Sequence, residues 1–457
     1  MADDLWISGG GTTSVATDEL YASAQKLAQL VLEVNQMQSR LGAVDRTISM
    51  DWLAAARAPS AAAQAELEID QAKIVLMEIE VQARLVQWSL NAAADGYGFV
   101  ERFLGGVGEA LMGAAGHVAG QFAPAIALSP AGLAGVGALA ATAPLVFSKE
   151  NNSLVTNPVA AGFVRNATMS VDEGMLGAAG VPLPVATALG GLGVTGLAFA
   201  AGGGMRAGSL AGALTETPVH LAGQRRVDVD AAPQGYSERL ARVPDCDRAG
   251  GSQVTIERYE MPDGSERFEV YVTGTVTFDP VATTEPWDMT SNLANAAGED
   301  GGSYRSVVQA MELAGVTAET PVQFTGYSQG GGTVARIAAS GDFSTAGVLT
   351  FGGPTGQIPV PADVTAVIVE HKDDIVPALG GAQANRDAVI IERDVFADRD
   401  IPKQYAVPAH HREYYEETAS LMDGADSEQV TGAIAKLDSF TAGATKVTST
   451  TYRFERG

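Results

Sequence analysis

Apolar residues recur at helical spacing in two stretches near the start of this chain. In the first stretch they are separated by seven, three, four, three and four positions, the spacing of one helix face: Leu20, Leu27, Leu30, Val34, Met37 and Leu41. A second stripe, within residues 63–92, contains Leu67, Ile74, Met77, Val81, Leu85 and Trp88. Gly42 and Pro59 lie between the stripes. We therefore predict an antiparallel helical hairpin within residues 1–105, with residues 1–16 as a loose lead-in.

The pattern then disappears into a region rich in Gly and Ala, residues 106–220. Neither 110–148 nor 174–204 contains an Asp, Glu, Lys or Arg. Both runs are long enough for a membrane span. Their many glycines and prolines, and their shortage of Leu and Ile, favour short helices that pack closely. A helical linker domain and a membrane-active segment are the two alternatives, and the polar stretch 215–252 is expected to be a linker.

From Gln253 onward the pattern becomes that of strands. Residues 254–259 alternate, Pro262-Asp263-Gly264 is a turn signal, and 268–272 alternate again, which predicts a β-hairpin. Further strands are expected at 321–326, 347–352, 364–370 and 387–393, with helices near 303–313, 331–340 and 410–422. This alternation predicts an α/β domain over 221–457, whose sheet is mostly parallel after an antiparallel start. The fold expected for the whole chain is this domain preceded by the hairpin and the Gly/Ala-rich helical region.

Charge and cysteine content narrow the function classes. The chain has 457 residues and a formal net charge of −25, which argues against binding nucleic acid. Cys246 is its only cysteine, so no disulfide framework and no metal-spaced cysteine set is expected. Residues 1–7 are acidic, and no apolar segment typical of a signal peptide follows. We expect a protein that is cytoplasmic or is secreted without a conventional signal peptide.

The sharpest motif is Gly326-Tyr327-Ser328-Gln329-Gly330, a G-x-S-x-G pattern. A predicted strand precedes it and a predicted helix follows it, which is the setting of a nucleophile elbow. Bulky neighbours at 326 and 330 would collide with the strand and the helix. We therefore predict that Ser328 is a catalytic nucleophile. The alternative is a Gly-rich turn that merely starts a helix.

Three segments together resemble α/β-hydrolases of the class 3 (fungal-type) lipase and esterase kind. The first, Val270 to Thr275, is a strand that ends in Gly-Thr. The second, Thr325 to Gly331, is the elbow. The third is Leu349-Thr350-Phe351-Gly352-Gly353-Pro354. The resemblance covers about residues 253–425. It implies an oxyanion hole formed by Thr275 and by the backbone N–H of Gln329. Thr273 stands where the family usually has Arg.

The same resemblance implies the partners of Ser328. Asp374, in an Asp-x-Val-Pro context after a strand, matches the family's acid, and Asp373 is the alternative, otherwise expected to cap a loop. The family's histidine is followed by x-x-Tyr, which selects His411 over its neighbour His410. His371 precedes the acid, against the order Ser, Asp, His, and is expected to be structural.

These residues predict a serine esterase or lipase that cleaves carboxylic esters of lipids or small acyl groups through an acyl-enzyme. No metal and no cofactor is expected. Residues 279–302 occupy the interval in which the family carries its lid. Apolar residues beside glycines there suit a mobile cover, and the alternative is a surface loop with one packed tryptophan, Trp287.

The N-terminal hairpin resembles the WXG100/LXG-type helical hairpins that carry proteins to type VII secretion systems. Tyr97-x-x-x-Glu101 follows the second predicted helix. This resemblance implies secretion machinery, or another helical partner, at residues 1–105. It leaves three functions open: a plain esterase, an exported phospholipase-type effector, and a non-catalytic helical interaction or membrane-active protein with peripheral membrane contact. A chain beginning near residue 215 is expected to keep esterase activity.

Overall fold

The computed structural model describes residues 5–9, 148–169, 215–246, 250–278 and 281–457, together with isolated positions between 34 and 79. Two compact units can be distinguished, Gly11–Met112 in one and Met1–Gly10 with Gly113–Gly457 in the other. The helices predicted for residues 17–41 and 63–92 lie almost wholly outside the described residues. The described positions there are helical; Val34 is buried, whereas Met37 is 53% exposed. The hairpin therefore stays a prediction.

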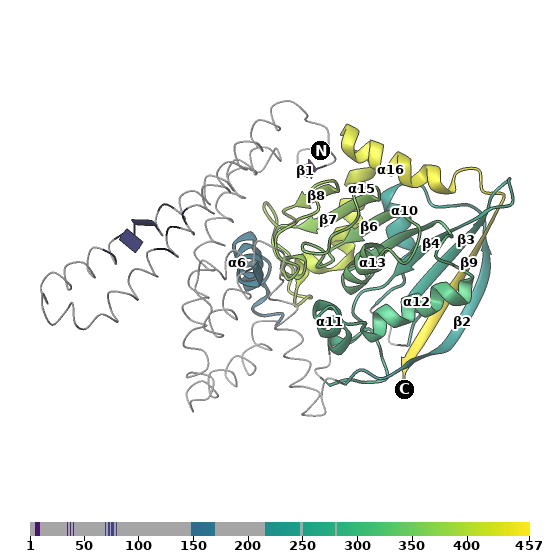
Figure 1. Ribbon diagram of the computed structural model, residues 1–457, viewed down its shortest axis with the longest axis horizontal. Coiled ribbons are helices and arrows are strands. Elements are labelled where there is room, and N and C mark those ends of the chain that lie inside the picture. The colour runs from purple at the N-terminus through teal and green to yellow at the C-terminus, as the bar shows by residue number, and fades with distance from the viewer. Residues whose placement is uncertain are drawn as a thin grey trace, which may run out of the picture. The chain divides into compact units, whose positions relative to one another are not determined.

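Within the described residues, nine strands form one sheet in the order β1-β8-β7-β6-β5-β4-β3-β9-β2 (Figure 1). The strands are β1 (Trp6–Gly9), β2 (Val219–Val229), β3 (Val254–Glu260), β4 (Glu266–Val272), β5 (Val322–Tyr327), β6 (Thr345–Phe351), β7 (Thr365–His371), β8 (Val389–Arg393) and β9 (Lys446–Arg456). Strands β4 to β8 are parallel to one another. The remaining strands pair antiparallel at the two sides.

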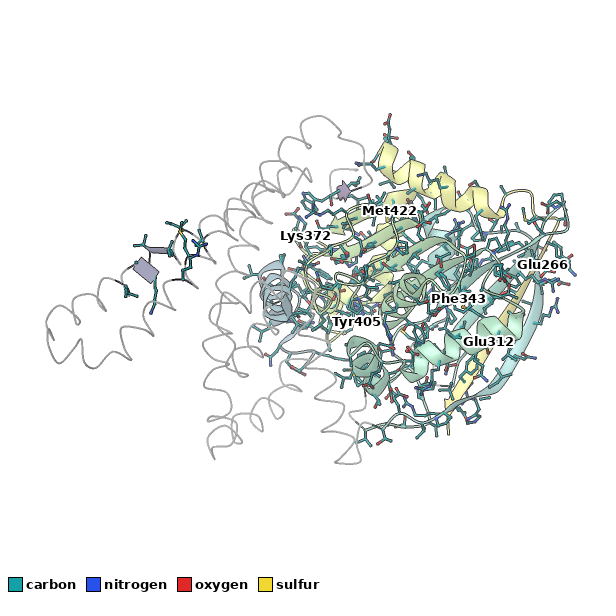
Figure 2. The ribbon with its side chains drawn as sticks, viewed as in Figure 1. Glu266, Glu312, Phe343, Lys372, Tyr405 and Met422 are labelled. Atoms are coloured by element: carbon teal, nitrogen blue, oxygen red, sulfur yellow. The ribbon has the colours of Figure 1, made fainter. Side chains whose placement is uncertain are left out.

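Helices cover both faces of the sheet (Figure 1). They are α6 (Pro158–Met169), α10 (Gly235–Arg242), α11 (Met289–Ala296), α12 (Gly302–Ala314), α13 (Gln329–Ser340), α14 (Ile375–Ala378), α15 (Arg412–Asp423) and α16 (Glu428–Thr441), with short 3-10 helices η1 (Asn152–Leu154) and η2 (Pro408–His410). Helices α12 and α13 pack on one face, and α10, α15 and α16 on the other. Met422 of α15, labelled in Figure 2, belongs to the second layer.

Every residue of β5 is buried, because helices cover this central strand on both sides. Phe324 belongs to the apolar cluster under α12 and α13, while Tyr327 belongs to the cluster under α10, α15 and α16. A parallel strand buried on both faces ends in a turn that opens at the carboxyl edge of the sheet. That edge is where ligand sites of open α/β sheets form. Ser328 follows β5 directly and so lies at this edge.

The predicted mixed α/β class is confirmed, and the strands and helices predicted after residue 253 lie within two residues of those found. Two expectations for other segments are wrong. Residues 6–9 are strand β1, which pairs with β8, and the Trp6 ring lies 3.8 Å from Nζ of Lys372, labelled in Figure 2. The polar stretch 215–252 contains β2 and α10, which are built into the α/β unit. Strand β2 was predicted to be a linker because its residues are mostly exposed at the edge of the sheet, so its sequence is polar.

The interval 279–302, in which a lid is expected, is packed against the rest of the α/β unit for much of its length. Trp287 is fully buried, and the Asp288 carboxylate pairs with Arg456 at 2.6 Å, both side chains being buried. Helix α11 packs against α12 and α13. Trp287 is thus the packed tryptophan of the alternative interpretation, and the mobile cover stays a prediction. Among the described residues, no helix combines the length and the apolarity that a membrane crossing requires.

Candidate active site

The turn between β5 and α13 is an elbow of the predicted kind. Ser328 has φ 53° and ψ −122°, and it is the one non-glycine residue with positive φ among the described residues. A Cβ on Gly326 would lie 2.5 Å from the Gly330 backbone, and a Cβ on Gly330 would lie 2.3 Å from the Val272 carbonyl oxygen. Only glycine therefore fits on either side of the serine. The strained backbone stays in place because its neighbours leave it no other conformation.

Hydrogen bonds fix the elbow from both directions. The Ser328 N–H donates to the Phe351 carbonyl at 2.8 Å, which ties the turn to the end of β6. The Ser328 carbonyl accepts from the N–H groups of Gly331 and Gly332, in the first turn of α13. The hydroxyl consequently projects from the carboxyl edge of the sheet, and the residue is 7% exposed.

His410 lies beside this hydroxyl. Its Nε2 is 2.8 Å from Ser328 Oγ, and its Nδ1 is 2.6 Å from Asp374 Oδ2. The side chain of Asp374 is fully buried. A continuous hydrogen-bonded chain thus runs from the serine through the imidazole to the carboxylate. Such a chain can take up the serine proton at Nε2 while the carboxylate stabilises the imidazolium.

The selection of His411 over His410 is therefore wrong by one residue. His411 precedes α15 as its N-cap in extended conformation, and its ring stacks on Tyr405 at 3.6 Å between centroids. Its Nδ1 is 4.0 Å from a Glu413 oxygen. Two adjacent histidines in such a turn point in different directions, and the spacing to a following tyrosine did not reveal which one faces the serine. The relevant tyrosine is Tyr415, five residues after His410.

Asp374 is held by three donors and is confirmed as the residue that contacts the histidine. Besides His410, the Tyr415 hydroxyl donates to Oδ2 at 2.9 Å, and the Val376 N–H donates to Oδ1 at 2.9 Å. The last bond makes Asp374 the N-cap of α14. Tyr415 approaches so closely that a Cβ on Gly352, at φ 62°, would lie 2.8 Å from its ring. A glycine is therefore required at this point of the Phe-Gly-Gly-Pro segment.

The alternative acid, Asp373, has the loop-capping role that was expected for it. Its two oxygens accept from the N–H groups of Val395 at 3.2 Å and Phe396 at 3.0 Å. Burial raises the pKa of its carboxyl to about 6. Asp373 thus fixes the start of the long connection from β8 to α15, which carries His410.

His371 lies behind the chain of hydrogen bonds and is structural, as expected. It is fully buried, and its ring stacks on Tyr415 at 3.7 Å. Burial lowers its pKa to about 4, so the ring is neutral at pH 7. Its Nδ1 is 2.6 Å from the Ala409 carbonyl and must donate to it, while Nε2 lies 2.8 Å from Thr418 Oγ1. The ring therefore fixes the residue directly before His410.

A tyrosine from the elbow holds His410 as well. The Tyr327 hydroxyl donates to the His410 carbonyl oxygen, and the two rings stack with centroids 5.5 Å apart. Sequence reasoning missed both Tyr327 and Tyr415 as contacts of the site. Tyr327 occupies the variable position of the G-x-S-x-G pattern, and no spacing rule connects either residue to the histidine loop.

The two residues expected at an oxyanion hole lie on segments next to Ser328. A Cβ on Gly274 would lie 3.0 Å from the Ser328 Cβ, so the segment leading to Thr275 passes directly beside the serine. Asn292 Nδ2 of α11 donates to Thr275 Oγ1 at 3.0 Å, which leaves the hydroxyl proton of Thr275 to point elsewhere. Gln329 begins α13, where backbone N–H groups lack partners within the helix. Their role as oxyanion donors stays a prediction.

Groups of three or more His, Cys, Asp or Glu side chains able to hold a metal ion do not occur in the part of the chain that the structure describes.

Comparisons with known proteins leave this geometry to carry the functional argument. No protein-family model, no curated protein sequence and no solved structure matches the chain.

Proposed function

We propose that this protein is a serine hydrolase that cleaves carboxylic esters. Ser328 is the nucleophile, His410 is the general base, and Asp374 is the carboxylate that stabilises the imidazolium. The observation that carries the proposal is the pair of contacts made by His410, 2.8 Å to Ser328 Oγ and 2.6 Å to Asp374 Oδ2. Side chains that merely pack have no reason to form this sequence of contacts on a strained serine. The class 3 lipase resemblance of the sequence agrees with the same three residue types.

The reaction would proceed in two steps. Ser328 Oγ attacks the ester carbonyl carbon and His410 Nε2 takes its proton, after which the imidazolium returns this proton to the leaving alcohol. Water then attacks the acyl-enzyme, again with His410 as base, and releases the carboxylic acid. The oxyanion would be stabilised by the Gln329 N–H and by Thr275. Acyl esters, including those of lipids, are the proposed substrates.

A fluorophosphonate probe tests the nucleophile directly. The wild-type chain should be labelled at Ser328, and Ser328→Ala should not be labelled although it stays folded. Ser340→Ala, a variant at the far end of α13, is the matched control and should be labelled like wild type. Labelling of Ser328→Ala at another serine would refute the assignment. p-Nitrophenyl esters of increasing chain length would then define the acyl group that the site accepts.

Export by a type VII system, through residues 1–105, remains a prediction from the sequence. Those residues lie almost entirely outside the described part of the chain, and no described contact favours an effector over a plain esterase.

A further inference from the structure

One described segment of the Gly/Ala-rich region, residues 148–169, packs directly on the loops that carry the histidine and the acid. It contains η1 and α6. Val155 and Ala161 are buried against Ile375 and Ala378, which belong to the helix capped by Asp374. Thr156 forms an isolated β-bridge with Asp374 itself. The backbone of the acid is therefore paired with a residue that precedes it by more than two hundred positions.

The same segment reaches the histidine loop through one buried amide. Asn152 is fully buried, and its Nδ2 donates to the carbonyl oxygens of Pro402 at 2.7 Å and Tyr405 at 2.9 Å. Its Oδ1 accepts from Lys403 Nζ at 3.4 Å. Tyr405, labelled in Figure 2, lies five residues before His410. The Asn152 side chain thus links two backbone carbonyls in the middle of the loop that carries His410.

The connection from β8 to α15, residues 394–411, needs such anchors because it contains only the short helix η2. Asp373 fixes its start, and His371 and Tyr327 fix its end at Ala409 and His410. These anchors come from β5, from β7 and from the turn that follows β7. The carbonyls of Pro402 and Tyr405 lie between these anchors, and among the described side chains only Asn152 donates to them.

An ion pair fastens the segment to the sheet near the acid. Arg165 of α6 donates to Glu370 Oε2 at 2.9 Å, and Glu370 lies near the end of β7, four residues before Asp374. Gln383 donates to the other oxygen of Glu370 at 2.9 Å. Burial raises the pKa of this carboxyl, and Arg165 acts against that rise. The segment therefore makes polar side-chain contacts with the histidine loop and with the strand that leads to the acid.

We propose that Asn152 is a positioning residue for His410, and that residues 148–169 complete the active site by holding the base and acid loops in register. The inference rests on the proposed hydrolase function. It departs from the expectation that a chain beginning near residue 215 keeps its activity, since that chain would lack every one of these contacts.

Asn152→Asp in the full chain is the test, because it keeps the shape of the side chain and removes both N–H donors. We expect kcat for a p-nitrophenyl ester to fall about 10-fold, the loss expected for one or two buried hydrogen bonds, with KM within about twofold of wild type. The rate constant for fluorophosphonate labelling of Ser328 should fall in parallel. Val159→Ala, at a side chain of α6 that is 80% exposed, is the matched control and should behave as wild type.

A folded Asn152→Asp with wild-type kcat and labelling rate would overturn the positioning role. If that variant does not fold, Arg165→Gln takes its place, since the Arg165 side chain is 27% exposed and the fold should tolerate the change. We expect a loss of about threefold in labelling rate there, and an unchanged rate would overturn the proposal. A wild-type chain that is not labelled at Ser328 would refute the hydrolase function instead, which separates the two failures.

Discussion

The nucleophile and the base of this site are held in place by opposite means. Ser328 is fixed by backbone that leaves no room, since glycines at 326 and 330 lie where any side chain would overlap backbone atoms. His410 is fixed by the bond that its Nδ1 donates to Asp374, by the bond that its carbonyl accepts from Tyr327, and by His371 through Ala409. The elbow joins the buried strand β5 to α13, whereas the base lies on a long loop. The glycines of the elbow therefore tolerate no substitution, whereas the loss of one hydrogen bond to the loop leaves the others in place.

Removal of the base should have the largest effect. His410→Ala takes away the group that accepts the serine proton, and we expect kcat to fall about 10⁴-fold or more, as for triad members elsewhere. His411→Ala is the matched control one residue away, and its activity should stay within a few-fold of wild type. Ester hydrolysis by the two purified variants decides between the histidines. The reverse result would reinstate the register inferred from the sequence.

Gly330→Ala tests the steric side of the comparison. Its Cβ would lie 2.3 Å from the Val272 oxygen and 2.4 Å from the Thr273 oxygen, so the strand leading to Thr275 must move. We expect loss of about 3 kcal/mol or more of folding free energy, or an insoluble chain, by analogy with severe overpacking. In Gly332→Ala the Cβ would meet Pro354 at 3.4 Å, an ordinary contact. Thermal melting should show only a small change for this control, and equal melting of both variants would contradict the argument.

Folding stability should depend on pH through His371, the residue that fixes the end of the histidine loop. Its pKa is about 4 in the folded chain and about 6.5 in an unfolded one, so the unfolded state binds more protons between these values. Stability should therefore fall as the pH drops from 6.5 to 4, by up to about 3 kcal/mol from this group. Asp373 opposes it, because its raised pKa of about 6 contributes stability that is present at low pH and is lost as the pH rises through 6.

Variants separate the two contributions in urea unfolding at pH 7 and pH 4.5. His371→Gln should lose less stability than wild type on acidification, since it has no imidazole to protonate. Asp373→Asn should lose more than wild type, since the opposing group is gone. Identical pH dependence in wild type and His371→Gln would show that His371 is not the buried neutral anchor described above.

Tyr415→Phe should have the smallest effect, because Asp374 keeps two other donors. The variant loses the 2.9 Å bond to Oδ2 and the 3.3 Å bond that the hydroxyl accepts from the His371 N–H, and it retains the stacked ring on His371. We expect kcat to fall by about 10-fold or less, equivalent to at most about 1.4 kcal/mol, because the ring stays in place. Tyr414→Phe, at the adjacent position, is the control. A loss comparable to that of His410→Ala would mean that the loop depends on one anchor rather than on several.

The sequence alone determined the parts of this protein that are local. The strand, turn and helix around Ser328 follow from a buried apolar run, a glycine pair and a helical pattern, all within twenty residues. Asp374 could be predicted because its Asp-x-Val-Pro context shortly after a strand matches the acid of the class 3 lipase resemblance. The α/β class followed from the alternation after residue 253, since periodicity records which faces of an element are buried.

Only the tertiary structure decided which histidine faces the serine and what holds it. His410 and His411 are adjacent residues of the same type. His410 ends η2, whereas His411 is the N-cap of α15. Strands β1 and β2 could not be predicted because they lie at the edges of the sheet and pair with strands more than two hundred residues away. Asn152 lies in a stretch that reads as linker. Its role depends on carbonyl groups of a distant loop, and contacts of that kind leave no periodicity in the sequence.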